Sequence, residues 1–71
     1  MFKIFMECDA SGSPFGQIAI NLMDIVIIEE VDENISEVFF YERCSLDSKF
    51  LGIKINELVD IYNKEIWGCK S

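Results

Sequence analysis

The side chains that could do chemistry in this sequence are carboxylates and thiols, because the sequence contains no histidine. Histidine is the usual general base near neutral pH and the commonest metal ligand. Without it, no Ser-His or Cys-His nucleophile can form within one chain. The four glycines are too few and too irregularly spaced for a phosphate-binding loop. We therefore expect no catalytic residue, no cofactor and no enzymatic activity.

The thiols belong to Cys8, Cys44 and Cys69. These cysteines lie far apart, form no Cys-x-x-Cys pair and have no histidine to complete a zinc site. An odd number of widely spaced cysteines favours three reduced thiols in a cytoplasmic protein, where they fill the core or lie near the surface. We expect no metal site.

Charge is divided unevenly along the chain. Residues 4–42 contain nine carboxylates and no Lys, Arg or His, so that residues 1–42 carry −8 and residues 43–71 carry +1 of the net −7. A surface of this kind repels nucleic-acid backbones and anionic membranes, and it attracts basic protein surfaces. We therefore expect no direct nucleic-acid binding, no membrane binding, and a partner with a basic surface.

Five of the carboxylates gather around one predicted turn: Glu29, Glu30, Asp32, Glu33 and Glu37. They either form a solvated turn that keeps an apolar chain in solution, or they form a negative patch that docks on a basic partner. Their spacing matches no calcium-binding loop. Phe39 and Tyr41 follow them in the chain as candidate apolar anchors, and Trp67 is either a lid on the sheet or a third anchor. These eight residues form the predicted partner-binding set.

An alternative site involves Arg43, Lys49 and Lys54, which lie in the only part of the chain with a basic balance. If these three residues converge at a subunit interface, an oligomer could bind a small metabolite or a signalling nucleotide and sequester it. The net charge of −7 argues against an anionic ligand in any other arrangement.

The elements that must position these residues follow from apolar periodicity. Strands are predicted over residues 2–8, 17–22, 25–31, 36–44 and 49–55, with a helix over residues 56–67. Alternation and β-branched content favour strand over helix for residues 17–30. Turns are expected at residues 11–14, 32–34 and 45–48. The sequence thus predicts one α+β domain, residues 1–71: a small antiparallel β-meander of four to five strands with one C-terminal amphipathic helix.

The predicted helix has Asn56 as its expected N-cap and Gly68 at its C-terminal stop. Its apolar stripe at helical spacing consists of Leu58, Val59, Ile61, Tyr62 and Ile66. This stripe can cover only one face of the sheet, so the strand with Phe39 and Tyr41 is either central and covered twice or presents its outer face to another subunit. We favour the second arrangement. Because 51% of this small chain is hydrophobic, we expect a homo-oligomer.

Residues 18–30, with the sequence IAINLMDIVIIEE, resemble the pattern iNxdxIvxIee of the small FlbD-type proteins, a family of flagellar and swarming motility factors. The acidic turn, the following strands and the helix continue the resemblance over about residues 2–66. It departs at residues 44–48, where the family has a glycine-containing hairpin, and at residues 53–56, the entry to the helix. The resemblance implies the same β-meander with a helix, and a small non-catalytic accessory protein.

In size, acidity and apolar content the chain is similar in general type to phage-encoded inhibitors of host defence systems and to antitoxin or immunity proteins. Its longest aliphatic run, residues 25–28, is far too short to span a membrane, and its N-terminus lacks the apolar stretch of a signal peptide. The leading hypothesis is a cytoplasmic binding protein that inhibits or regulates a larger basic target, such as one that handles nucleic acids. The alternatives are the ligand-sequestering oligomer and a motility or structural accessory factor.

Overall fold

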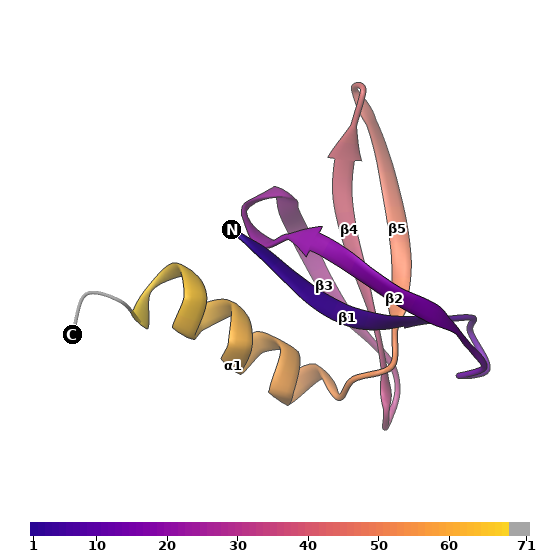
Figure 1. The fold of residues 1–71 in the computed structure, drawn as a ribbon. Helices are drawn as coiled ribbons and strands as arrows, with labels where there is room; N and C mark the ends of the chain where they lie inside the picture. The colour runs from indigo at the N-terminus through magenta and orange to yellow at the C-terminus, as the bar shows by residue number, and fades with distance from the viewer. Residues whose placement is uncertain (69–71) are drawn as a thin grey trace.

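The computed structural model describes residues 1–68 of the 71-residue chain. The elements in chain order are β1 (Phe2–Cys8), β2 (Pro14–Asn21), a short 3-10 turn η1 (Leu22–Asp24), β3 (Ile25–Asp32), β4 (Ile35–Glu42), β5 (Ser45–Leu51) and α1 (Ile55–Ile66). The five strands form one antiparallel sheet in the order β2-β1-β5-β4-β3, with the helix at the C-terminal end of the chain (Figure 1). The predicted α+β fold is confirmed.

The sheet consists of two parts that are joined by a short pairing. The strand pairing between the β1–β2 hairpin and the β3–β4–β5 meander consists of Glu7–Leu51 and Cys8–Phe50. Figure 1 accordingly shows β1 and β2 crossing in front of β4 and β5 at a steep angle. Because η1 connects β2 at one edge directly to β3 at the other, the sheet curls and has a concave side.

The core fills this concave side and is closed by α1. Its buried members are Phe5, Ile20, Leu22, Ile25, Val38, Leu51 and Leu58. Leu58 is the helix residue that enters the core, and its side chain is fully buried. Its neighbour Val59, which the helical stripe was expected to include, is exposed, because the helix packs on the core through Leu58, Ile61, Tyr62 and Ile66.

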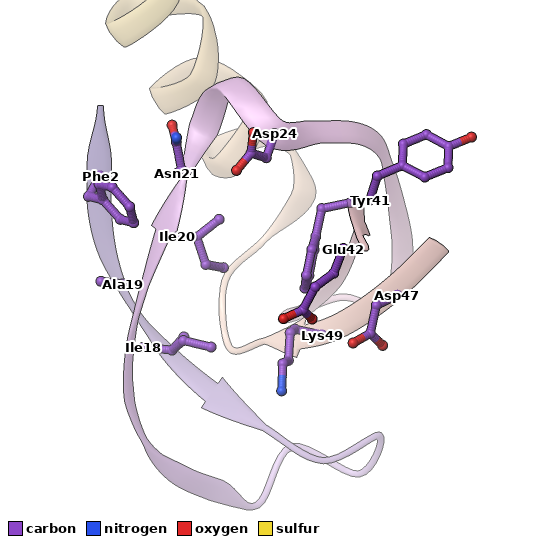
Figure 2. Close-up of a pocket in the computed structure, with 11 residues that line it drawn as sticks. Phe2, Ile18, Ala19, Ile20, Asn21, Asp24, Tyr41, Glu42, Asp47 and Lys49 are labelled. Atoms are coloured by element: carbon purple, nitrogen blue, oxygen red, sulfur yellow. The ribbon is translucent and has the colours of Figure 1, made fainter. Parts of the chain in front are cut away.

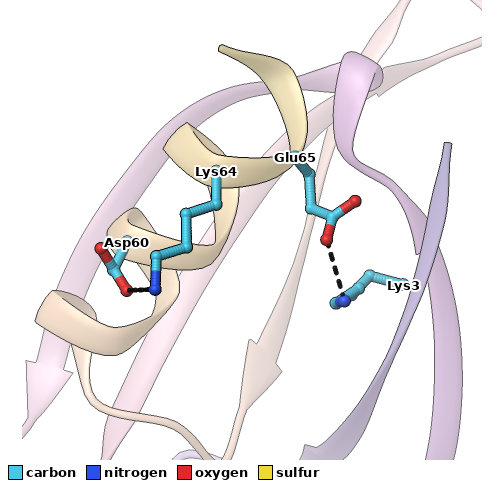
Figure 3. A network of polar contacts seen from close by, with 4 residues as sticks. All are labelled: Lys3, Asp60, Lys64 and Glu65. Carbon is cyan, nitrogen blue, oxygen red and sulfur yellow. Dashed lines mark hydrogen bonds and ion pairs between the residues drawn. The ribbon is translucent and has the colours of Figure 1, made fainter. Parts of the chain in front are cut away.

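Ion pairs link the helix to β1 and connect two of its own turns (Figure 3). Lys3 of β1 and Glu65 of α1 are joined by a 3.1 Å contact between Nζ and Oε2. Lys64 pairs with Asp60 one turn earlier at 3.2 Å, an i,i+4 contact within the helix. The helix begins at Ile55, one residue earlier than predicted, so its N-cap is Lys54 and not Asn56. No side chain forms a capping hydrogen bond there.

The β4–β5 hairpin corrects the prediction of a turn at residues 45–48. The turn is made by Arg43 and Cys44, which have φ values of 53° and 68°. Two successive left-handed residues are typical of a tight type I′ hairpin turn, which Asn-Gly usually marks. Since neither residue here is Gly or Asn, the turn had no local signal. The strand β5 therefore begins at Ser45, and the polar residues after it belong to a half-exposed strand.

Two smaller boundaries also differ. Leu22 lies in η1 and not at the end of the second strand, because Asn21 caps this turn by accepting a hydrogen bond from the N–H of Met23 at 3.1 Å. The second strand begins at Pro14, three residues earlier than predicted. A proline is tolerated there because β2 is an edge strand and Pro14 is its first residue.

Candidate partner-binding face

The strands β3, β4 and β5 have one side in the core and one side turned outward. On β4, Val38 is fully buried in the core, so its neighbours Glu37 and Phe39 point to the opposite side. We call this outward side the acidic face. By register it contains Ile27 and Glu29 of β3, Glu37, Phe39 and Tyr41 of β4, and Leu46, Ser48 and Phe50 of β5.

Two carboxylates of the acidic face oppose each other. Glu29 of β3 is the direct cross-strand partner of Glu37 of β4. Side chains in direct register have Cβ atoms about 4.5–5.5 Å apart, and like charges at this spacing are destabilising. Neither carboxylate forms an ion pair with any side chain in the described part of the chain. The pair is therefore an unsatisfied negative site on the surface.

The other predicted carboxylates lie at the same end of the β3–β4 hairpin. Glu30 pairs in register with Ser36 and so points to the side away from Glu29. Asp32 ends β3 and accepts a hydrogen bond from the backbone N–H of Glu33, which starts the turn. All three side chains are exposed. The hairpin thus brings the five predicted carboxylates to one end, but divides them between its two sides.

The three predicted anchors are placed differently from one another. Phe39 lies half-buried on the acidic face, where its cross-strand neighbours are Ile27 and Ser48. Tyr41 is exposed further along the same face, opposite Leu46. Trp67 is 62% exposed and so is not a lid on the sheet, because it caps α1 after the last turn that reaches the core.

Sequence reasoning missed the apolar partners of Phe39 and Tyr41. Ile27 and Leu46 are exposed on the acidic face, and Phe50 lies beside Glu37. Their alternation with the core residues of their strands was visible in the sequence. Ile27 reaches Phe39 through the bulge in β3 between Glu30 and Asp32, which no local pattern indicates. Leu46 opposes Tyr41 because the β4–β5 turn lies at Arg43 and Cys44.

A pocket of about 410 Å³ opens on the concave side, between β2 and the projecting β4–β5 hairpin. In Figure 2, Ile18 and Ile20 point toward it from β2, and Lys49 faces them from the opposite wall, whereas Tyr41 points away. The charged residues that line the pocket are Asp24, Glu42, Asp47 and Lys49. Three carboxylates against one cation favour a neutral or cationic ligand.

The alternative basic set does not converge within one chain. Arg43 is at the tip of the β4–β5 hairpin, Lys49 is within β5, and Lys54 precedes the helix. Lys49 lies four residue steps along β5 from Ser45, the first residue after the turn, which corresponds to about 13 Å at 3.3 Å per residue. Lys49 is also engaged by Glu7, with 3.5 Å between Nζ and Oε2. Arg43, Lys49 and Lys54 therefore form no joint site for an anion within one subunit.

The loop between β1 and β2 is organised by Asp9. Its Oδ1 atom accepts hydrogen bonds from the Ser11 hydroxyl at 2.7 Å and from the backbone N–H groups of Ser11 and Ser13, each at 2.9 Å. These bonds, the one from the Ser11 hydroxyl first, hold the pKa of Asp9 below its ordinary value. The carboxylate is thus occupied in holding the loop.

The thiols and the remaining carboxylates form no metal site among residues 1–68, where no group of three or more potential ligands is suitably arranged. Cys8 is a buried free thiol and Cys44 an exposed one, while Cys69 lies outside the described residues. Burial, and secondarily the charges of Asp9 and Glu7, raise the pKa of the Cys8 thiol. The described residues also include no helix with the length and apolarity needed to cross a membrane.

Comparisons with known proteins found no match to this chain among protein-family models, curated proteins or solved structures. The geometry of the acidic face and of the pocket is therefore the basis for assigning a function.

Proposed function

We propose that this protein acts by binding, and that its acidic face docks on a basic surface of a larger protein. The observation that carries this proposal is the in-register pair of Glu29 and Glu37, which has no cation from the described residues and lies beside exposed apolar side chains. A cationic side chain from a partner would relieve the repulsion between the two carboxylates. Binding would then remove a destabilising feature of the free protein.

The proposed mechanism combines steering and burial. The net charge of −7 attracts a basic partner over distance and raises the association rate. Phe39 and Tyr41 then supply apolar contact at the centre of the face. Phe39 is already half-buried between its strand neighbours, so it loses little side-chain freedom on binding.

The proposed biological role is inhibition or regulation of a basic target in the cytoplasm, such as a protein that handles nucleic acids. A negatively charged face of this kind could occupy the surface that such a target presents to a phosphate backbone. Phage anti-defence proteins, antitoxins and immunity proteins are small acidic binders of this general type. The size of 71 residues and the net charge of −7 support this class, and the proposal requires no catalytic residue.

The test uses a short arginine-rich peptide with one aromatic residue as a substitute for a basic protein surface. The double variant Glu29→Lys with Glu37→Lys, which reverses both charges of the acidic face, should bind the peptide more slowly, and its association should depend less on salt. The control, Glu42→Lys with Glu57→Lys, changes the net charge equally at exposed sites outside the predicted set. Equal weakening in both double variants would mean that affinity follows net charge, and would contradict docking through the acidic face.

A second candidate function is sequestration of a small molecule in the 410 Å³ pocket. Its carboxylates favour a neutral or cationic metabolite over a signalling nucleotide. Native mass spectrometry of gently purified protein should then reveal a bound mass. A cationic ligand should be lost from the variant Glu42→Gln with Asp47→Asn and kept by Arg43→Ala, because Arg43 does not line this pocket. A spectrum without added mass would contradict this second function.

A further inference from the structure

The outward side of the β1–β2 hairpin carries no charged side chain. Strand alternation and register place six residues on it: Phe2, Ile4 and Met6 of β1, opposite Asn21, Ala19 and Gln17 of β2. We call this surface the neutral face. The chain has 13 acidic and 6 basic residues, so a two-stranded surface without any charge stands apart from the rest of the molecule.

The neutral face is also the most apolar exposed surface of the hairpin. Phe2, Ile4 and Met6 are 69%, 64% and 44% exposed, and Phe15, at the bulged end of the same hairpin, is 68% exposed. Taking about 200 Å² for each large side chain when fully exposed, these fractions correspond to roughly 500 Å² of apolar surface. A standard interface buries about 800 Å² per partner, so this patch supplies more than half of one.

The register of β1 prevents the strand from hiding these residues. The opposite side of β1 holds Phe5, which is buried in the core, and Lys3, which pairs with Glu65 of the helix. A shift of one residue would bring Ile4 inward but would expose Phe5 and break the Lys3–Glu65 contact. The exposure of Phe2, Ile4 and Met6 is therefore fixed by the fold, and residues 1–68 leave these side chains uncovered.

We propose that a second copy of this chain covers the neutral face, so that two β1–β2 hairpins pack against each other in a symmetric homodimer. Two copies with a net charge of −7 repel each other wherever their carboxylates meet. The neutral face allows them to approach without bringing like charges together, and a two-fold interface uses the same surface on both copies. A basic partner would find no carboxylate among the six residues of the face, although Asp32 lies near Met6 at its edge, and this favours a second copy as the occupant.

This inference is independent of the proposed function, because it uses the opposite part of the sheet. The neutral face belongs to the β1–β2 hairpin, whereas the acidic face belongs to β3, β4 and β5. The dimer leaves both acidic faces free. It would present two such faces to a target, which raises the apparent affinity if the target offers two matching basic surfaces.

The test is the mass of the full chain in solution, measured by sedimentation or light scattering over a range of concentrations. The wild type should have twice the 8.2 kDa mass of one chain. Ile4→Glu places a carboxylate at the centre of the neutral face and should give a monomer that keeps its circular dichroism spectrum and its binding to the arginine-rich peptide. Leu46→Glu adds the same charge to the acidic face and should remain a dimer.

Three results would overturn the dimer: a monomeric wild type at every concentration, an unchanged mass for Ile4→Glu, or dissociation of Leu46→Glu. Ala19→Glu, at the exposed cross-strand partner of Ile4, repeats the test if Ile4→Glu folds poorly. If neither the wild type nor the variants bind the peptide, while the wild type and Leu46→Glu are dimers and Ile4→Glu is a monomer, then the proposed function fails and the dimer stands.

Discussion

Glu29 of β3 and Glu37 of β4 lie directly opposite each other on two hydrogen-bonded strands, and no cation from the described residues pairs with either carboxylate. A pair at such a position stabilises a sheet when the charges are opposite or both side chains are apolar, and each cross-strand pair contributes about 0.2–1 kcal/mol. Two carboxylates at this position repel each other, so the free chain is less stable than it would be with a favourable pair there. This cost links the stability of the protein to the binding proposed for the acidic face.

Removing one charge of this pair should stabilise the protein. Glu29→Gln is expected to raise the free energy of unfolding by about 0.5 kcal/mol at low ionic strength, with a smaller gain in high salt because salt screens the repulsion. Urea unfolding at two salt concentrations measures both effects. Glu57→Gln is the control, since it removes an exposed carboxylate from the first turn of α1, where negative charge is favourable. An equal gain in both variants would contradict the cross-strand repulsion.

The β4–β5 turn should be improved by residues that accept a positive φ. Arg43→Asn with Cys44→Gly is expected to raise the free energy of unfolding by about 1–2 kcal/mol, because both positions are left-handed. The matched control, Glu33→Asn with Asn34→Gly, makes the same sequence in the β3–β4 turn, where neither residue has a positive φ. Thermal unfolding should show a gain only in the first variant. A gain in both variants would mean that Asn-Gly stabilises either turn whatever its backbone conformation, and would contradict the role of the positive φ values.

The attachment of the helix depends on Leu58. Leu58→Ala should lower the free energy of unfolding by about 2–5 kcal/mol, because it leaves a cavity among fully buried neighbours. Val59→Ala, one position along and exposed, should cost less than about 1 kcal/mol. Urea unfolding followed by circular dichroism measures the difference. Similar losses in the two variants would contradict the orientation of α1 on the sheet.

The Asp9 loop should make stability depend on pH. The pKa of Asp9 is lowered in the folded state, so its contribution is present above the unfolded pKa of about 3.9 and is lost as the pH falls through the folded value. Asp9→Ala should therefore be less stable than the wild type at neutral pH, and the difference should shrink below about pH 4. Urea midpoints at neutral and acid pH test this. A difference that does not change with pH would exclude the charge of Asp9 as its source.

The two described thiols should differ in reactivity. The raised pKa of Cys8 leaves little thiolate at neutral pH, and the side chain is buried, whereas Cys44 is exposed. Alkylation of the folded protein followed by peptide mapping should therefore modify Cys44 much faster than Cys8. Equal rates in the folded protein, with unfolding excluded by a circular dichroism control, would contradict the buried position of Cys8.

The elements that the sequence predicted well are those with local signals. The first strand ends where predicted, and the β3–β4 turn forms at Glu33 and Asn34 as the polar run 32–34 indicated. The β4–β5 turn was misplaced because Arg43 and Cys44 carry no turn chemistry, while the polar residues after them resemble a turn. Propensity identifies a turn only when the residues that adopt it are the usual ones.

The candidate site was only partly predictable for the same reason. The five carboxylates are close in sequence around a hairpin, so their grouping at one end was visible. The direct opposition of Glu29 and Glu37 depends on the bulge between Glu30 and Asp32, which shifts the register of β3. The sequence did not indicate that Ile4 is exposed. The alternating residues Phe2, Ile4 and Met6 are more apolar than Lys3, Phe5 and Glu7, yet it is Phe5 that enters the core. Such choices are made by contacts between distant segments, which periodicity cannot supply.

The central claim is that the acidic face binds basic surfaces, and amide chemical shifts of the isotope-labelled chain test it most directly. Titration with the arginine-rich peptide should move the resonances of Glu29, Glu37 and Phe39 most, with small changes in α1. The helix serves as the internal control because it carries Glu57, Asp60 and Glu65. Shifts that are as large in α1 as on the acidic face, or that centre on the pocket, would contradict the account.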